Sequence, residues 1–244
     1  MEEKAQEKYQ RSYKYIDIIM LMYVLVLVLS NIGSSAKIID WGIRIGSIPL
    51  SFDAGTLLFP IGYVIGDVMT EVYGYKRARR IIWIGFGAMV FSALVFKLIQ
   101  VLPGEATWEA SVGQGAYNQI LGGMSSGAII TASLLGYLAG SFSNAILMSV
   151  MKVMTKGKWL WTRTIGSTIV GEAVDTAIFI LAATLLGVFP KSLFWSLTIT
   201  NYIFKVLIEV LITPLTYGVI NTLKRVEDID AVDEDISLSP FKFR

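Results

Sequence analysis

The chain contains no cysteine, no histidine and few charged residues. Without cysteine there is no disulfide and no thiolate nucleophile. Without histidine, the Ser-His-Asp and Cys-His types of catalysis are excluded, and the commonest metal ligand is missing. Only 16% of the 244 residues are charged, whereas a soluble domain has about a quarter. This is too little charge to cover the surface of a soluble protein. With cysteine and histidine also missing, we expect no catalytic residues, metal or cofactor.

Long apolar runs account for much of the chain, which is 54% hydrophobic with a mean hydropathy of +0.61. Several runs exceed the roughly 18 residues that mark a membrane-spanning helix. We therefore predict an all-α, multi-pass membrane protein with six transmembrane helices. The predicted helices cover residues 15–33, 55–73, 80–102, 127–151, 164–188 and 195–223. The helical domain is thus 15–223, between an N-terminal segment (1–14) and an acidic tail (224–244).

Lysine and arginine residues predict the orientation in the membrane. Four of them occur in each of four segments: the N-terminal segment, the loop after the second helix, the loop after the fourth helix and the tail. The opposite side has four in all: Lys37, Arg44, Lys97 and Lys191. Loops that remain in the cytoplasm are enriched in these residues. Six spans with both termini in the cytoplasm agree with this distribution, whereas an odd number of spans would scatter the clusters.

The predicted outer loops and the tail differ in character. Residues 37–52 alternate apolar side chains and contain Gly and Pro, so a short hairpin or a re-entrant turn is expected. Residues 103–126 form a long Gly-rich segment carrying Trp108 and Tyr117. A loop of this length suggests a lid over a binding site, with an aromatic belt at the membrane surface as the alternative. The acidic run 227–235 is expected to be solvated and disordered.

Two pairs of glycine residues have the spacing that allows helices to approach closely. Gly62 and Gly66 lie on the second predicted helix, and Gly136 and Gly140 on the fourth. Small residues four apart commonly mark helix contacts in membranes. We expect both pairs to pack helices within one molecule, with a dimer interface as the alternative.

Two acidic residues, Asp67 and Glu71, share one face of the second predicted helix. A charge near the centre of a bilayer costs about 2.5–3.5 kcal/mol on insertion scales, so such residues are usually functional. Glu71 is close to the end of the helix and to the basic cluster 76–80. We therefore interpret Glu71 as a brace paired with nearby arginines, and leave Asp67 open between bracing and ligand binding.

The fifth and sixth predicted helices carry charges near the middle of the membrane. Glu172 and Asp175 are three residues apart on one helix, and Asn201, Lys205 and Glu209 follow a four-residue spacing on the next. Two close carboxylates repel each other and require a cation or a proton. Lys205 is the candidate cation. A pair that only fixes helix packing is the structural alternative to a binding site.

A buried set of carboxylate, amide and ammonium groups suits a polar ligand with several N–H donors. The N1–H and exocyclic amino group of a guanine-like ring match a carboxylate in a two-point hydrogen bond. Phe179, Tyr202 or Trp108 would provide a stacking surface for such a ring. A cation or a proton would also fit two carboxylates, so these residues alone do not identify the ligand.

Three sequence motifs resemble one known family. They are Asp67-Val-Met-Thr-Glu-Val-Tyr-Gly74 followed by Ala78-Arg79-Arg80, Gly171-Glu-Ala-Val-Asp-Thr-Ala-Ile-Phe179, and Asn201-Tyr-Ile-Phe-Lys205 with Pro214-Leu-Thr-Tyr-Gly218. In this order they resemble the vitamin uptake transporter family, whose members are queuosine-precursor transporters. The resemblance covers nearly the whole chain. It implies a six-helix fold like that of the substrate-binding subunits of energy-coupling-factor transporters.

The resemblance also implies a function and a site. The expected function is import of 7-cyano- or 7-aminomethyl-7-deazaguanine, precursors of a modified tRNA nucleoside, across a bacterial inner membrane. The expected partners are a deazapurine and the lipid bilayer, with no nucleic acid; a separate ATPase module and a homo-oligomer are left open. The expected substrate-binding residues are Glu172, Asp175, Thr176, Asn201, Lys205, Asp67, Trp108 and Phe179. Glu172 and Asn201 depart from the pattern of some members, which leaves another heterocycle or vitamin as the alternative ligand.

The source of energy and two rival functions remain to be considered. The sequence has no G-x-x-x-x-G-K-[ST] motif, so the chain itself has no P-loop for nucleotide hydrolysis. Either a separate ATPase drives transport, or the chain works alone as a facilitator or an ion-coupled carrier. An intramembrane enzyme would need two carboxylates that flank a substrate, whereas the pairs here are sequential on one helix. A membrane-anchored assembly factor would need a soluble interaction domain, and none is evident. We therefore expect a transporter rather than an enzyme.

Overall fold

The computed structural model describes residues 13–45, 48–187, 191–233 and 237–242. Most of this part of the chain is helical. The helices are α2 (Ile16–Ala36), α3 (Phe59–Tyr73), α4 (Tyr75–Val101), α5 (Ala106–Ser111), α6 (Gly113–Ser125), α7 (Gly127–Met154), α8 (Leu160–Leu185) and α9 (Phe194–Glu227), with two short 3₁₀ turns at Ala54–Leu57 and Lys191–Leu193. A helix occupies each of the six predicted positions. Residue 188 and most of the predicted N-terminal segment lie outside the described residues.

Five stretches of helix are long and apolar enough to cross a membrane. They belong to α2, α4, the joined stretch of α6 and α7 (Gly113–Met154), α8 and α9, so the chain is a multi-pass membrane protein. The remaining predicted span, α3, has 15 residues and reaches about 22 Å, less than the ~30 Å of a hydrocarbon core. Pro60 stands in its first turn, a position where its missing N–H costs nothing. The six-span prediction is therefore confirmed for five helices only.

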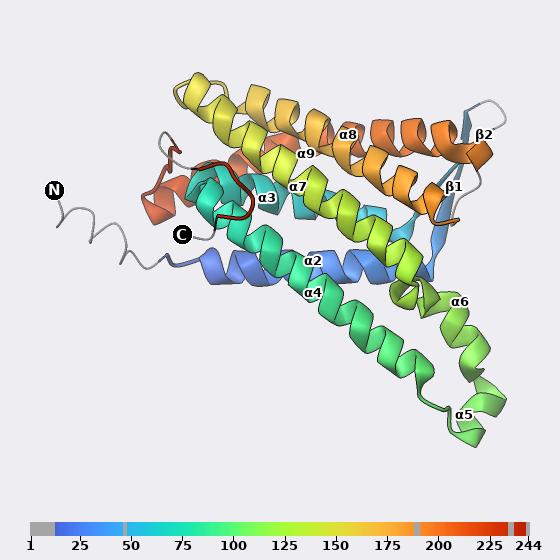
Figure 1. Cartoon of the computed structure of the whole chain (residues 1–244). Helices are drawn as coiled ribbons and strands as arrows, with labels where there is room; N and C mark the ends of the chain where they lie inside the picture. Colours follow the sequence, from blue (N-terminus) through green and yellow to red (C-terminus); the bar gives the residue numbers. More distant parts are fainter. Residues whose placement is uncertain (1–12, 46–47, 188–190, 234–236, 243–244) are drawn as a thin grey trace.

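The segment before α3 is a β-hairpin, as one of the two predictions for it stated. Strand β1 (Ile38–Ile45) pairs antiparallel with β2 (Ile48–Asp53), with Ile38 opposite Asp53 and Ile45 opposite Ile48. Figure 1 shows the hairpin at the end of the bundle opposite the two termini. The start of α2 and the end of α9 thus lie together at the opposite end of the bundle.

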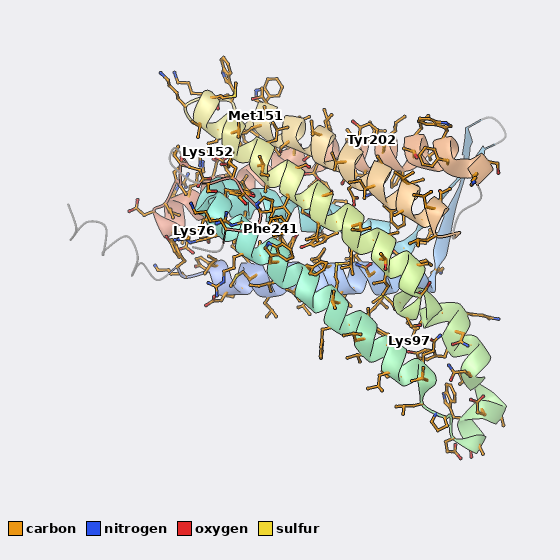
Figure 2. The ribbon with its side chains drawn as sticks, in the orientation of Figure 1. Lys76, Lys97, Met151, Lys152, Tyr202 and Phe241 are labelled. Carbon is orange, nitrogen blue, oxygen red and sulfur yellow. The ribbon has the colours of Figure 1, made fainter. Side chains whose placement is uncertain are left out.

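The basic residues follow the same polarity. Lys76 and Lys152 lie at the end that holds the termini, and Lys97 lies at the far end (Figure 2).

The predicted lid region, 103–126, forms the helices α5 and α6 instead of a loop. In Figure 1 α6 lies beside the far part of α4, and α5 lies beyond the end of α4. Tyr117 anchors α6 by donating a hydrogen bond to the Phe96 carbonyl on α4.

Helices α7 and α8 pack closely because glycines face each other between them. A Cβ atom on Gly140 would lie 2.5 Å from Cβ of Asp175, and one on Gly171 would lie 2.8 Å from Cβ of Asn144. Gly136 similarly faces Asp175 and Phe179. The prediction that Gly136 and Gly140 pack helices within the molecule is confirmed. Gly66 has nothing within 4 Å of its ideal Cβ position, so the Gly62/Gly66 prediction was wrong for Gly66.

The outward faces of the long helices are apolar. Phe91 on α4 is 68% exposed and Leu211 on α9 is 77% exposed. Such side chains would be a liability in water and are favourable against lipid. The buried apolar core gathers near the end that holds the termini, where Met69, Tyr75 and Met148 are almost fully enclosed.

The acidic tail is docked on the bundle, so the prediction of a solvated, disordered tail was wrong for its described residues. Asp233 accepts hydrogen bonds from the Tyr75 backbone N–H and the Ser149 hydroxyl, both at 2.8 Å. Gly74 allows this approach: its φ is +88°, and a Cβ there would lie 3.0 Å from Asp233 Oδ1. Sequence composition alone suggested solvation because these partners come from distant helices.

Residues 237–242 continue the contact along α4. Arg79 donates to the carbonyls of Ser237 and Ser239, and the Trp83 indole N–H donates to the Pro240 carbonyl at 2.9 Å. We call residues 228–233 and 237–242 the C-terminal strap. It covers the terminal end of α3 and α4 with backbone and side-chain hydrogen bonds.

Candidate functional site

The site begins with a polar stripe on α8. Glu172 and Asp175 lie about one turn apart and are only 2% and 7% exposed. The rest of α8 is apolar enough to span a membrane. Gly136 of α7 leaves room for the Asp175 carboxylate: a Cβ atom there would lie 2.8 Å from Asp175 Oδ1. The other oxygen of Asp175 and the Glu172 carboxylate both meet α9.

Lys205 of α9 lies between the two acids. Its Nζ is 2.5 Å from Asp175 Oδ2 and 3.2 Å from Glu172 Oε2. The Tyr63 side chain of α3 is also hydrogen-bonded to Glu172. The structure thus brings together the predicted residues Glu172, Asp175 and Lys205, and adds Tyr63.

Three other predicted residues lie on the same two helices, within one turn of this group. Thr176 follows Asp175 directly and is buried, and Phe179 lies one turn further along α8. Asn201 is one turn before Lys205 on α9 and is half-buried. We call Glu172, Asp175, Thr176, Asn201, Lys205 and Phe179 the α8–α9 site.

Two predicted residues lie outside the α8–α9 site. Trp108 is on α5, which Figure 1 places beyond the far end of α4. The structure thus does not bring Trp108 to the site. Asp67 is one turn after Tyr63 on α3 and accepts a 2.8 Å hydrogen bond from the Asn144 amide of α7.

Several buried polar atoms find no hydrogen-bond partner among the described residues. Some of them belong to Asp67, its partner Asn144, or residues within one turn of Glu172, Asp175 and Lys205. These atoms are Asp67 Oδ2, Asn144 Oδ1, Thr168 Oγ1, Glu172 Oε2, Thr176 Oγ1 and Glu209 Oε1. Glu172 Oε2 does have an ion-pair partner, because it lies 3.2 Å from Lys205 Nζ. An unsatisfied buried polar atom costs about 1–3 kcal/mol. A set of such atoms on α3, α7, α8 and α9 indicates a place that a ligand or a proton completes.

The charges are also unbalanced there. Within the described residues, Asp67, Glu172, Asp175 and Glu209 are buried acids, and the ammonium group of Lys205 pairs with two of them, Glu172 and Asp175. Charges inside a membrane are expensive and usually mark a substrate or ion pathway. The excess of acceptors over donors favours a ligand with N–H donors or a bound proton.

Glu71, one turn after Asp67, is in the opposite situation. Its carboxylate receives two hydrogen bonds of 2.7 Å from Arg163 and contacts Lys224 at 2.5 Å and Lys152 at 3.3 Å. We call these four residues the terminal clamp. The bracing interpretation of Glu71 fits this geometry. Its partners come from α7, α8 and α9 rather than from the neighbouring cluster 76–80, which differs from the prediction.

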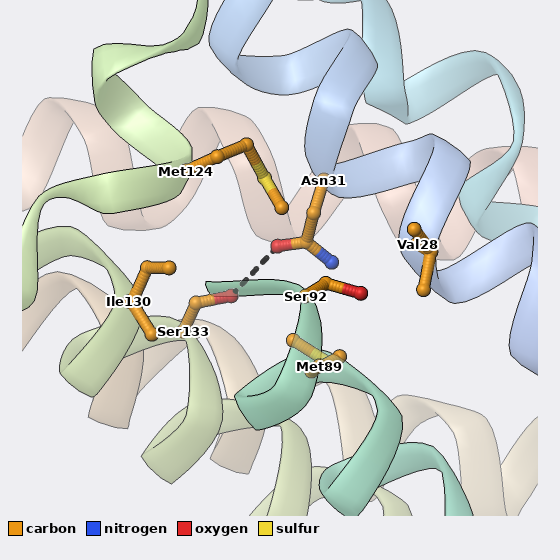
Figure 3. A pocket seen from close by; sticks show the side chains of 7 residues that line it. All are labelled: Val28, Asn31, Met89, Ser92, Met124, Ile130 and Ser133. Carbon is orange, nitrogen blue, oxygen red and sulfur yellow. Dashed lines mark hydrogen bonds between the residues drawn. The ribbon is translucent and has the colours of Figure 1, made fainter. Parts of the chain in front are cut away.

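A further polar pocket lies between α2, α4, α6 and α7. Figure 3 shows Asn31 pointing at Ser133, with 3.3 Å between their oxygens, and Met89 and Met124 nearby. Its volume is about 10 Å³, which is room for a single water. It is too small for a heterocycle, and it does not contact the α8–α9 site.

Sequence reasoning missed two residues of the site region. Asn144 was passed over because α7 reads as a packing helix rich in small residues, yet it is an isolated amide in an apolar helix. Tyr63 precedes the acidic motif by one turn and looked like an ordinary aromatic. The turn-by-turn series Tyr63, Asp67 and Glu71 on one face of α3 was the signal that would have found it.

The chain is similar to known proteins over the part of the sequence that forms this site. The family described as "Putative vitamin uptake transporter" matches residues 53–219, which include every helix of the α8–α9 site. The "Probable queuosine precursor transporter" of Bacillus subtilis is 27% identical over 69% of this chain and 72% of its own. The "Queuosine precursor transporter" of Escherichia coli is 26% identical over 71% of this chain and 76% of its own. A third relative, from Haemophilus influenzae, is 26% identical over 68% of this chain and 67% of its own. No solved structure matches the chain, so the likeness to energy-coupling-factor subunits stays a prediction.

Proposed function

Because the chain belongs to the vitamin uptake transporter family, we propose that it imports queuosine precursors across the bacterial inner membrane. The family and these relatives are transporters rather than enzymes. The substrates proposed are 7-cyano-7-deazaguanine and 7-aminomethyl-7-deazaguanine. The observation that carries the proposal is the α8–α9 site, a buried acid–lysine group with unpaired acceptors inside the matched region.

The chemistry of the site supports a guanine-type edge. Glu172 accepts the N1–H and the exocyclic amino group, while Lys205 stays on Asp175. Thr176 and Asn201 provide the remaining polar contacts, and Phe179 lies against the ring. An adenine-type ring presents an acceptor at N1 that would face the carboxylate. A site built around a hydrogen-bonded group rejects an analogue without it by roughly 10⁴-fold.

The orientation proposed has both termini in the cytoplasm. The support is the gathering of Lys76 and Lys152 at the end that holds the termini, together with the positive-inside rule. Substrate then moves from the hairpin end toward the terminal clamp. Neither an ATPase module nor oligomerisation is needed for this assignment, and both are left to experiment.

The test uses cells that cannot make the precursor and are supplied with limiting 7-cyano- or 7-aminomethyl-7-deazaguanine. Expression of this chain should raise the queuosine content of tRNA, and a Lys205→Met variant should not. Equal queuosine with and without the chain would overturn the proposal. Binding of purified protein to a panel of deazapurines and vitamins separates a deazaguanine from another heterocycle as ligand. Competition by adenine analogues as strong as by guanine analogues would remove the carboxylate account alone.

A further inference from the structure

The Asp67–Asn144 pair is not used by the proposed substrate contacts. Asp67 is fully buried and Asn144 is 4% exposed. Asn144 Nδ2 donates to Asp67 Oδ1 at 2.8 Å. The second oxygen of each group, Asp67 Oδ2 and Asn144 Oδ1, has no hydrogen-bond partner within the described residues. Both atoms are acceptors, so they cannot satisfy each other as a carboxylate and an amide.

One proton satisfies both atoms at once. A carboxylic acid and a primary amide form a cyclic pair in which the amide N–H donates to one acid oxygen and the acid O–H donates to the amide oxygen. The first of these hydrogen bonds is already present. A proton on Asp67 Oδ2 completes the second, and it also removes a charge from a buried position where an unpaired carboxylate is costly.

In the described part of the chain, no cation forms an ion pair with Asp67. Arg163, Lys152 and Lys224 are engaged by Glu71, and Lys205 is engaged by Glu172 and Asp175. Among the described residues, no group of three or more acidic side chains is arranged to hold a metal ion. A proton is thus the ligand that fits one carboxyl and one amide.

A second acid lies within electrostatic range. Glu209 of α9 is 3% exposed and its charge interacts with those of Asp67 and Glu172. Its Oε1 also finds no hydrogen-bond partner in the part of the chain that the structure describes. Glu209 lies one turn after Lys205 on α9, so it is a second buried acid whose charge interacts both with Asp67 and with the α8–α9 site. The ionisable groups around Asp67 are Tyr63 and Glu71 on α3, Glu172 and Arg163 on α8, and Lys205 and Glu209 on α9.

We propose that Asp67 and Asn144 form a proton-binding site and that the proton leaves toward Glu209 when substrate is transported. The O–H bond on Asp67 Oδ2 breaks and an O–H bond forms on the Glu209 carboxylate, so charge and atoms balance without a further reactant. The coupling to substrate rests on the proposed function, whereas the proton site itself does not.

The proton site is tested without substrate. Infrared spectra of the purified protein in lipid nanodiscs at pH 7 should contain the C=O stretch of a buried protonated carboxyl, shifted in deuterated water. Asp67→Asn should remove that band, and Glu109→Gln, a change at an exposed acid on α5, should not. An unchanged band in Asp67→Asn would overturn the proposal.

The Asp67→Asn variant should fold, because its amide donates to Asn144 Oδ1 in place of the proton. Thermal unfolding checks this. If the variant fails to fold, Asn144→Ala gives a second reading: loss of the amide should shift the frequency of the Asp67 band. If the frequency of the Asp67 band is unchanged in Asn144→Ala, the amide of Asn144 is not the hydrogen-bond partner of Asp67.

The coupling is tested in proteoliposomes with labelled 7-cyano-7-deazaguanine. Wild-type protein should exchange label without a gradient and accumulate several-fold more when the outside is made acidic. Asp67→Asn should exchange label but ignore the gradient. Exchange with no response to the gradient in the wild type would overturn coupling and leave the proposed function intact. Absence of exchange would count against the proposed function, while the infrared result still decides the proton site.

Discussion

The terminal clamp and the α8–α9 site are both buried groups of acids and cations, yet their stoichiometry is opposite. In the clamp, one carboxylate (Glu71) is surrounded by three cations (Arg163, Lys152 and Lys224). In the α8–α9 site, two carboxylates share Lys205. The clamp is saturated, because both carboxylate oxygens of Glu71 have cationic partners. In the site, buried hydrogen-bond acceptors outnumber the donors.

This difference separates two uses of an intramembrane charge. A saturated group has nothing to offer a ligand and acts on the fold, because its donors are taken up by Glu71, by Asp230 and by backbone carbonyls. An undersaturated group needs a partner from outside. Charge inside a membrane is therefore informative only together with a count of its hydrogen-bond partners.

The largest effect is expected when the clamp is broken. Arg163→Met leaves the Glu71 carboxylate without its two-point partner in a buried position, which costs about 3–5 kcal/mol of stability. Thermal unfolding and yield of purified protein measure this. Arg80→Met, the same change at an exposed position of the same end, is the control and should behave as wild type. Similar losses in both variants would contradict the clamp.

A smaller effect on folding, with a large effect on binding, is expected at the site. Lys205→Met should weaken deazaguanine binding about 100-fold. Without the ammonium group the two close carboxylates repel each other and take up a proton, so Glu172 loses a charged hydrogen bond to the ligand that is worth about 1.5–3 kcal/mol. The double change Lys205→Met with Asp175→Asn tests the bracing alternative. If Lys205 only neutralises Asp175, the double variant should regain binding; continued loss supports a direct role in the site.

The C-terminal strap should contribute an intermediate amount of stability. Asp233→Asn weakens the hydrogen bonds that residue 233 accepts from the Tyr75 N–H and the Ser149 hydroxyl. We expect the free energy of unfolding to fall by about 1–2 kcal/mol. Hydrogen exchange should rise at the start of α4. The exposed Asp17→Asn variant at the same end should change neither quantity, and equal exchange in the two would contradict docking.

A still smaller effect is expected for Thr176→Val. The change removes a hydroxyl that is buried without a partner among the described residues, so unfolding stability should stay equal or rise slightly. Ligand binding should weaken about 5- to 10-fold, the value of one neutral hydrogen bond. Thr131→Val, on the exposed side of α7, serves as control. Unchanged binding would remove Thr176 from the site.

The smallest effect concerns the pH dependence of the strap. Burial would raise the pKa of Asp230, but the ammonium groups of Lys152 and Lys224 outweigh it and lower the pKa below its ordinary value. The stabilisation is therefore present at neutral pH and is lost as the pH falls through the lowered pKa. Hydrogen exchange near Ala231 should rise on acidification more in wild type than in Asp230→Asn. Equal pH profiles would contradict the contribution.

The sequence was sufficient for features that depend on neighbours along one helix. Long apolar runs predicted the position of each membrane helix, and the spacing of Glu172 and Asp175 predicted that they share a face. The α9 stripe likewise placed Lys205 as their cation. These predictions hold because helix geometry converts spacing directly into position.

Features that depend on contacts between helices could not be predicted. The partners of Glu71 come from three other helices, and the strap looked like solvated tail because Asp233 meets Tyr75 only in the folded chain. The position of Trp108 failed as an expectation for the same reason. Its segment forms helices that lean along α4, which nothing local in residues 103–126 determines.

The short helix α3 has a consequence for how the protein enters the membrane. With 15 residues and two buried acids, α3 is too short and too polar to be held stably by lipid alone, because an acid near the bilayer centre costs about 2.5–3.5 kcal/mol. The groups that neutralise or bond these acids, Asn144, Lys152, Arg163 and Lys224, all lie on helices that are synthesised later. During biogenesis α3 must therefore wait in the translocon or at the membrane surface until α7, α8 and α9 arrive, and its insertion is a late, cooperative event rather than the second in a series.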